Sequence, residues 1–137
     1  MPDLVMHHYL ANSVYESLPH EMREKISNRN LFCFTSAGPD PFFFYKFLEK
    51  EENKRVASIG HFMHENMIHE FFMQLAEKMK TTKHPTILFS YLTGFLTHHA
   101  LDSKVHPYVF YKTGVYQHKN PETFVYRGLH TKIERAM

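Results

Sequence analysis

The sequence predicts an all-α fold in one domain that spans residues 1–137. Three observations carry this prediction. Apolar residues recur at helical spacing along most of the chain, and no stretch shows the strict alternation of a half-buried strand. No internal repeat appears, and 137 residues with 43% apolar content suit a single hydrophobic core. We therefore expect several helices packed around one core.

The helix boundaries follow from prolines and charged stretches. Pro19 closes the first helix, Pro85 suits the first turn of the central helix, and Pro107 disfavours helix at the residue before it. The charged run 49–54 is expected to be a connector, and 108–121 to be irregular. Helices are expected over 4–18, 21–27, roughly ten residues after Pro41, 56–80, 85–105 and 121–137. The last helical pattern runs to the final residue, which predicts that the chain is a truncated form of a longer protein.

Composition narrows the functional classes. The net charge of +2 gives no electrostatic case for a polyanion-binding surface beyond local patches. Cys33 is the only cysteine, which excludes an internal disulfide and a thiolate zinc cluster. The sequence contains no apolar run of the roughly 18 residues that a membrane span needs, and its start does not resemble a secretory signal, so we expect a cytoplasmic protein. The twelve histidines are unusual, because imidazole is the commonest metal ligand.

The strongest pattern lies in the central helix, where His98, Asp102 and His106 follow one another at intervals of four residues. Each step of four advances about 40° around a helix, so the three side chains share one stripe. The rise from His98 to His106 is roughly 12 Å, too long for both to bind one ion. If the stripe binds metal rather than forming a solvated polar face, it serves more than one ion, with Asp102 as the natural bridge.

Further candidate ligands lie elsewhere in the chain. His130 and Glu134, four residues apart, place an imidazole beside a carboxylate on the last helix. Asp40 lies in a Gly-Pro-Asp-Pro turn that two prolines make rigid. His61 and His64 share a face of the long helix, and one of them can supply a ligand, whereas His7 and His8 in the first helix are by themselves expected to be surface imidazoles.

One motif invites a wrong assignment. The string HENMIH resembles the H-E-x-x-H motif of zinc proteases but contains one extra residue. His64 and His69 therefore point about 140° apart on a helix and cannot chelate one ion, which disfavours a metalloprotease. Phosphate-binding glycine loops and the nucleophile-elbow motif are missing from the sequence, as is the adjacent His-Asp pair of other helical phosphohydrolases.

Taken in order, MPDLVMHHYLANSV, GPDPFF, FLTHHALDSKV followed by HPYVFYKTG, and HTKIER resemble the zinc-dependent phospholipase C family, a relative of the single-strand-specific zinc nucleases. The resemblance implies a multi-helix orthogonal bundle with three zinc ions in a cleft. It implies a first zinc on Asp40, His64 (or His61), His98 and Asp102, a second on His106, His130 and Glu134, and a third on His7 (or His8) with Asp102 bridging. The secreted members also use an N-terminal tryptophan at the third site, and this chain contains no tryptophan.

These residues predict a metal-dependent phosphoester hydrolase that activates water with two or three zinc ions, other divalent metals being alternatives. Asp40 is the candidate catalytic residue, because it could orient or deprotonate the attacking water. The expected substrate is a small phosphoester or a phospholipid; no stable nucleic-acid partner is indicated, and the sequence does not fix the oligomeric state. The alternative is a metal-binding helical protein of the same family that has lost its catalytic activity.

Overall fold

The computed structural model describes residues 4–46, 48–66, 68–117 and 119–136, and within these ranges the side chains of residues 50, 53, 131 and 134–136 are left undescribed. The described residues form helices and no strand, which confirms the predicted all-α class. In chain order the elements are α1 (Leu4–Ser17), α2 (His20–Lys25), α3 (Arg29–Thr35), the 3-10 helix η1 (Asp40–Phe43), α4 (Lys50–Glu65), α5 (Ile68–Thr81), α6 (Pro85–Thr113), the 3-10 helix η2 (Pro121–Tyr126) and α7 (Leu129–Ala136).

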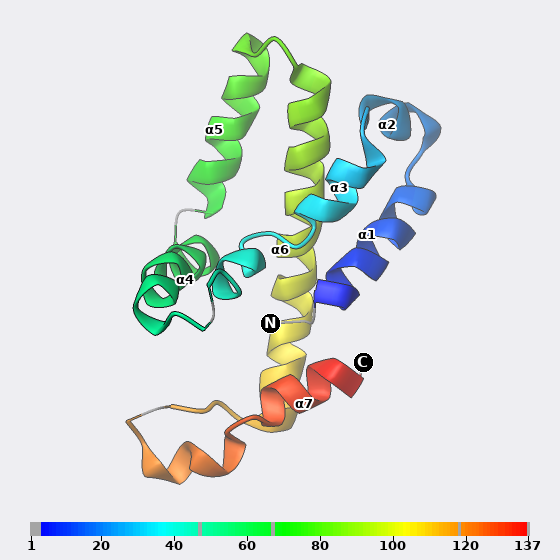
Figure 1. Cartoon of the computed structure of the whole chain (residues 1–137). Coiled ribbons are helices and arrows are strands. Elements are labelled where there is room, and N and C mark those ends of the chain that lie inside the picture. The colour runs from blue at the N-terminus through cyan, green and yellow to red at the C-terminus, as the bar shows by residue number, and fades with distance from the viewer. Residues whose placement is uncertain (1–3, 47, 67, 118, 137) are drawn as a thin grey trace.

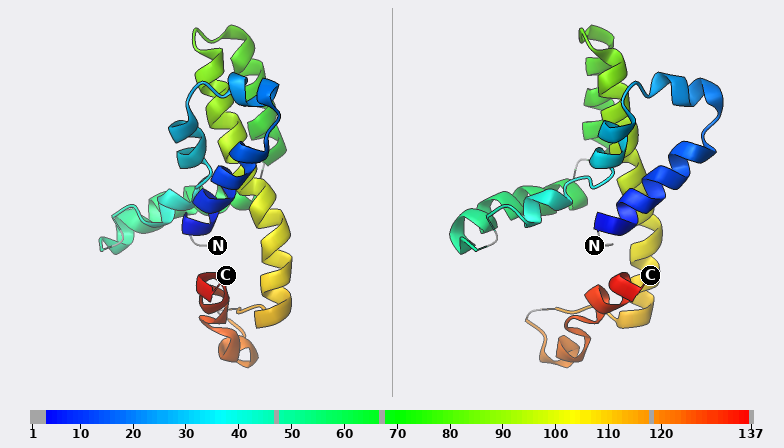
Figure 2. Two further views of the ribbon diagram at one scale, coloured as in Figure 1. Left: turned by 90° about the vertical axis from the view of Figure 1, so that its right-hand side faces the viewer. Right: turned by 45° about the vertical axis from the view of Figure 1, so that its right-hand side comes forward.

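The long helix α6 is the spine of the molecule, and the other elements are arranged around it (Figure 1). Helix α5 runs antiparallel beside its first half, α1 and α3 pack against it from the other side, and α7 packs near its C-terminal end. Helix α4 packs on η1 and extends away from the spine, as the second view in Figure 2 shows. The middle of α6 therefore faces α1, η1 and α4 together.

The hydrophobic core lies where α1 and α3 meet α6. Its fully buried members are Ala11, Ile26, Phe32 and Cys33, and the cysteine is a free thiol. Helix α3 approaches α6 closely because position 94 is glycine: a Cβ there would lie 2.2 Å from the carbonyl oxygen of Phe32. Thr35 strengthens this contact by donating its hydroxyl to the carbonyl of Tyr91 at 3.1 Å. This packing brings the turn after α3 against the middle of α6.

The prediction that the central helix ends near His106 was wrong, because α6 continues through Pro107 to Thr113. Proline removes one backbone hydrogen bond from a helix interior, a cost that favourable packing can offset. Val109 and Thr113 are both buried beyond the proline, where α6 packs against α7. The helix ends at Gly114, whose φ of +69° is a conformation that glycine adopts without strain.

Several shorter boundaries also differ from the prediction. The stretch expected to form one helix over 56–80 forms α4 and α5, separated at Asn66, whose backbone is extended. Helix α4 also includes most of the charged run that was expected to be a connector. The aromatic helix expected after Pro41 is only the short η1, and the last helix divides into η2 and α7 around Gly128, where φ is +78°.

Candidate metal centre

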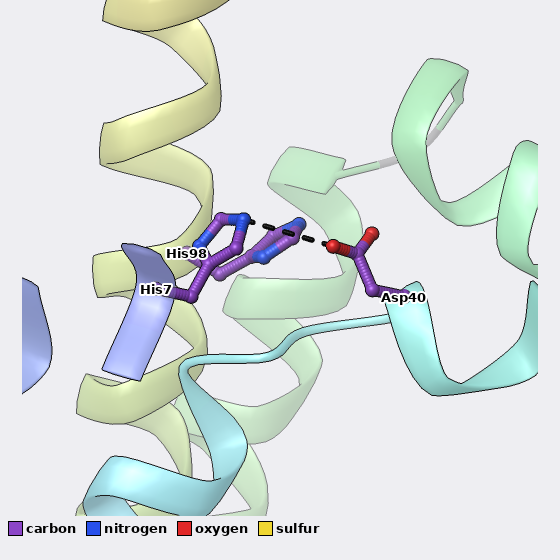
Figure 3. A group of neighbouring side chains, drawn as sticks. All are labelled: His7, Asp40 and His98. Atoms are coloured by element: carbon purple, nitrogen blue, oxygen red, sulfur yellow. Dashed lines mark ion pairs between the residues drawn. The ribbon is translucent and has the colours of Figure 1, made fainter. Parts of the chain in front are cut away.

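Side chains from four elements converge at the middle of α6. They are His7 of α1, Asp40 of η1, His64 of α4, and His98 and Asp102 of α6. Two groups of three, His7–Asp40–His98 and His64–His98–Asp102, each present ligand atoms within 4.8 Å of one another. Figure 3 shows the first group, with both imidazoles and the carboxylate directed toward a common point. These buried groups could hold a metal ion.

Asp102 lies at the centre of the cluster, and its two oxygens face different histidines. Oδ1 is 3.4 Å from Nε2 of His7 and 4.0 Å from Nε2 of His106. Oδ2 is 3.4 Å from Nε2 of His98 and 3.5 Å from Nε2 of His64. The helical stripe predicted from the sequence therefore exists, and a carboxylate placed in this way has one oxygen available to each side.

The backbone fixes which nitrogen of His98 and of His64 faces the cluster. The Nδ1–H of His98 donates to the carbonyl of Ser36 at 3.2 Å, and the Nδ1–H of His64 donates to the carbonyl of Gly60 at 2.8 Å. A carbonyl only accepts, so each neutral ring carries its lone pair on Nε2. The two Nε2 atoms lie 3.3 Å apart. Two lone pairs at this distance repel each other unless a cation, either a metal ion or a proton, lies between them.

Polar atoms at the centre of the cluster also lack hydrogen bonds. Among the described residues, Nδ1 and Nε2 of His7 and both oxygens of Asp102 are buried without a well-aligned hydrogen-bond partner. Burying a polar group without a partner costs about 1–3 kcal/mol, and more for a charged group. A bound cation would satisfy the carboxylate oxygens of Asp102 and one nitrogen of His7, so the residues fit a metal centre.

The pKa values of the cluster suit metal ligation. Burial, aided by the neighbouring His7 and His64, lowers the pKa of His98 to about 4, so this ring is neutral at neutral pH. Burial acts to raise the pKa of Asp102, but contact with His7 and the charges of the surrounding histidines outweigh it and the pKa is lowered. Burial likewise opposes the shift of His64, yet its pKa is raised, chiefly through its contact with Asp40 at 3.1 Å. A proton on His64 can thus take the place of a metal ion.

The turn between α3 and η1 holds His98 in position. Gly38 has a φ of +55°, and a Cβ at this position would lie 2.4 Å from the ring of His98. Ser36, two residues earlier, supplies the carbonyl that orients the same ring and donates its own hydroxyl to the carbonyl of His7. Sequence reasoning did not single out Ser36 or Gly60, because backbone carbonyls carry no residue-specific signal. Gly38 was identified only as a turn residue, because a glycine next to a proline indicates a turn.

A cavity of about 700 Å³ opens onto one side of the cluster. His64, His98, Asp102 and His106 line it, whereas His7 and Asp40 do not and lie deeper in the molecule. Most of the remaining wall is apolar and includes Phe43, Met63, Ile68, Phe95 and Phe110. The cavity therefore joins a polar, histidine-rich patch to an apolar wall, a combination typical of small-molecule sites.

The two members of each histidine pair differ in burial or in contacts. His7 is buried in the cluster, whereas its neighbour His8 is exposed. His64 reaches Asp40 and Asp102, whereas His61 packs its ring against Phe43. His7 contacts both Asp40 and Asp102, and the assignment of ligands to separate ions that the resemblance implies stays a prediction.

The second predicted site is described only in part. His130 of α7 lies beside His106, with ring centroids 5.5 Å apart, so α7 brings the two histidines of that site together. The side chain of Glu134 lies outside the described part of the chain. The two histidines lie at the C-terminal end of the helical stripe, and the ligand set predicted there stays a prediction.

Comparisons of the chain with protein-family models, curated proteins and solved structures gave no match. In the described part of the chain, no helix combines the length and apolar character needed to cross a bilayer. The function of the site is therefore inferred from the chemistry and the geometry of its own residues.

Proposed function

We propose that the protein is a metal-dependent phosphoester hydrolase of the phospholipase C-like type, acting through a centre of two or three zinc ions. The observation that supports this most directly is the convergence of His7, Asp40, His64, His98 and Asp102 beside an open cavity. These residues are separated by up to 95 positions in the sequence and come from four elements. A polar face of a single solvated helix would not bring them together.

The donor set suits zinc and other divalent metals such as iron, nickel and manganese. The cluster offers imidazole nitrogens and carboxylate oxygens but no thiolate, since Cys33 is buried in the hydrophobic core. His98 has a single lone pair, on Nε2, and would therefore bind one ion, whereas Asp102 has two oxygens and would bridge toward His106. Zinc held by these residues would supply a Lewis acid for a phosphoryl oxygen and would lower the pKa of a bound water toward neutrality.

The residues of the chain divide into two roles in this proposal. His64, His98, Asp102 and His106 line the cavity and would face the phosphoryl group, with the apolar wall against the organic part of the substrate. Asp40 was expected to act on the attacking water. Its carboxylate does not line the cavity and lies against His7 and His64, so a ligand role fits its position better. A phospholipid or a small phosphoester with an apolar group suits the cavity.

Hydrolysis of a chromogenic phosphodiester by zinc-loaded protein tests this proposal. His7 and His8 provide a matched pair of variants, because they are adjacent on α1 but only His7 is buried in the cluster. We expect His7→Ala to reduce hydrolysis at least about tenfold and His8→Ala to leave it unchanged. Zinc binding without hydrolysis of phosphodiesters or phosphomonoesters would instead support the alternative of an inactive metal-binding protein.

A further inference from the structure

The end of the molecule formed by the last turns of α6, the following loop and η2 exposes an unusual number of large apolar side chains. Tyr111 is 82% exposed and Val125 is 69% exposed, and Tyr108 and Phe124 are each exposed by half or more. Soluble proteins rarely leave aromatic residues clustered in water without a function. We call the surface formed by residues 108–127 the aromatic end; it excludes residue 118, which the structure does not describe.

Two sets of contacts lie within the aromatic end. The ammonium group of Lys112 lies 5.8 Å from the ring centre of Tyr108 and 5.5 Å from that of Tyr111. Beyond the helix, the rings of Tyr116 and Phe124 lie 5.9 Å apart. Both views in Figure 2 place η2 beside the end of α6, away from the tip formed by α5 and the start of α6. The aromatic end thus carries two aromatic groups at the same end of the molecule, one on the last turns of α6 and one formed by the following loop and η2.

Positive charge is concentrated on the same stretch. The aromatic end holds Lys112, Lys119 and Arg127 and a single acidic residue, Glu122, and two further basic residues, Lys104 and Lys132, flank it in the sequence. The whole chain holds sixteen Lys and Arg against fourteen Asp and Glu, so the rest of the chain is slightly acidic. The five basic residues, including Lys119 and Arg127, are all exposed. An aromatic surface with cationic side chains around it is complementary to a surface with apolar and anionic components.

We propose that the aromatic end docks on an anionic lipid surface. Tyrosine and phenylalanine favour the boundary between headgroups and acyl chains, and Lys and Arg nearby are attracted by acidic headgroups. A second copy of the chain fits less well, because a two-fold interface would bring the positive charges of both copies together. The proposal does not depend on the metal centre or on its proposed activity.

Docking in this way would orient the cavity. Phe110 and Pro107 line the cavity wall, and Tyr108 and Tyr111 lie on the same turns of α6. A lipid surface against the aromatic end would therefore lie near one edge of the cavity. The two features can be tested separately, because the exposed residues of the aromatic end that carry the proposal are not metal-ligand candidates.

Vesicle co-sedimentation of the full chain tests the proposal. The probes are vesicles of phosphatidylcholine with about 30% phosphatidylserine, and vesicles of phosphatidylcholine alone. We expect binding to the anionic vesicles that weakens as salt is raised, and at least about tenfold weaker binding to the neutral ones. Equal binding to both, or binding to neither, would overturn the proposal.

Two variants locate the docking surface, and each has a matched control. The first variant combines Tyr111→Ser with Val125→Ser and removes exposed apolar groups from the aromatic end. Its control is Leu48→Ser, which removes an apolar side chain that is 82% exposed next to α4. A triple change of Lys112, Lys119 and Arg127 to Gln is matched by the same change of Lys25, Lys78 and Lys83, which are exposed outside the aromatic end.

Both aromatic-end variants should bind the anionic vesicles at least about fivefold more weakly than the parent, and both controls should bind as the parent does. Circular dichroism and the melting temperature establish that each variant is folded. Parental binding by the folded aromatic-end variants would overturn the proposal. So would a parent that forms a dimer through this surface, measured by light scattering, and does not bind vesicles.

Discussion

The two ends of the candidate metal centre are held in different ways. At the inner end His98 is buried and oriented by the carbonyl of Ser36, and His7 is buried against it with ring centroids 4.2 Å apart. At the outer end the side chain of His106 is 24% exposed, and its neighbour His130 comes from the short helix α7. The inner ligands are therefore preorganised by the hydrophobic core, whereas the outer pair depends on how α7 docks on α6. We expect the inner end to bind metal more tightly.

The largest expected effect is that of Asp102→Asn, which acts on both ends at once. The substitution keeps the shape of the side chain but removes the charge that faces His7, His64, His98 and His106. We expect loss of more than one ion per chain. Changing a residue that only hydrogen-bonds a metal ligand typically lowers activity roughly 10–100-fold, and we expect Asp102→Asn to lower hydrolysis by more than this. His130→Ala serves as the comparison, and it should weaken only the outer site. Full metal content and activity in Asp102→Asn would refute the bridging role.

Removal of metal should lower the stability of the whole protein. Without a cation, the cluster buries unpaired nitrogen and oxygen atoms at the junction of α1, η1, α4 and α6. A ligand present at about 100 times its dissociation constant stabilises a protein by about 2.7 kcal/mol, which corresponds to roughly 10 °C in melting temperature here. Thermal unfolding with and without a chelator measures this difference. An unchanged melting curve after verified metal loss would contradict the prediction.

An effect of similar size is expected from Gly38→Ala, which disturbs the inner end alone. A methyl group at this position combines a strained φ of +55° with a clash against the His98 ring, at a cost of about 3 kcal/mol. Gly128→Ala is the matched control, because φ is +78° but a Cβ there meets nothing within 4 Å. It should cost only about 1 kcal/mol. Urea unfolding measures both variants, and equal costs would mean that the His98 contact contributes nothing.

The effect of pH on the metal-free protein should be comparable or smaller. The pKa of His98 is about 4 in the folded protein and 6.5 in the unfolded chain, so the folded state binds fewer protons between these values. Stability is therefore lost as pH falls from 6.5 to 4, by at most about 3 kcal/mol from this residue. The raised pKa of His64 acts in the opposite direction, since its stabilisation is present at low pH and lost as pH rises above 6.5. Urea unfolding of chelated parent and His98→Leu should show a steeper pH dependence in the parent, and parallel curves would contradict the assignment.

The sequence predicted the parts of the site that depend on local periodicity. The stripe of His98, Asp102 and His106 followed from helical spacing, and the Gly-Pro-Asp-Pro turn marked Asp40. The continuation of α6 through Pro107 could not be predicted locally, because it depends on tertiary packing of buried Val109 and Thr113. The break at Asn66 was missed because the apolar residues of α4 and α5 continue one helical pattern.

The choice within each histidine pair required the fold. His7 and His8 are adjacent in sequence, and the resemblance left both open as ligands. Only the packing of α1 against α6 buries one and exposes the other. The backbone carbonyls that orient His64 and His98 were also outside the reach of sequence patterns, since any residue can supply a carbonyl.

Metal content is the most direct test of the central claim that this cluster is a metal centre. The measurement is elemental analysis of the protein purified without chelator or affinity metal, before and after zinc reconstitution. The account predicts two to three ions per chain, most of them zinc, and loss of at least one ion in His98→Ala, which removes the ligand common to both inner groups. His99→Ala, which changes the adjacent histidine on α6 outside both groups, should retain the parental content. Less than one ion per chain after reconstitution, or equal content in the two variants, would contradict it.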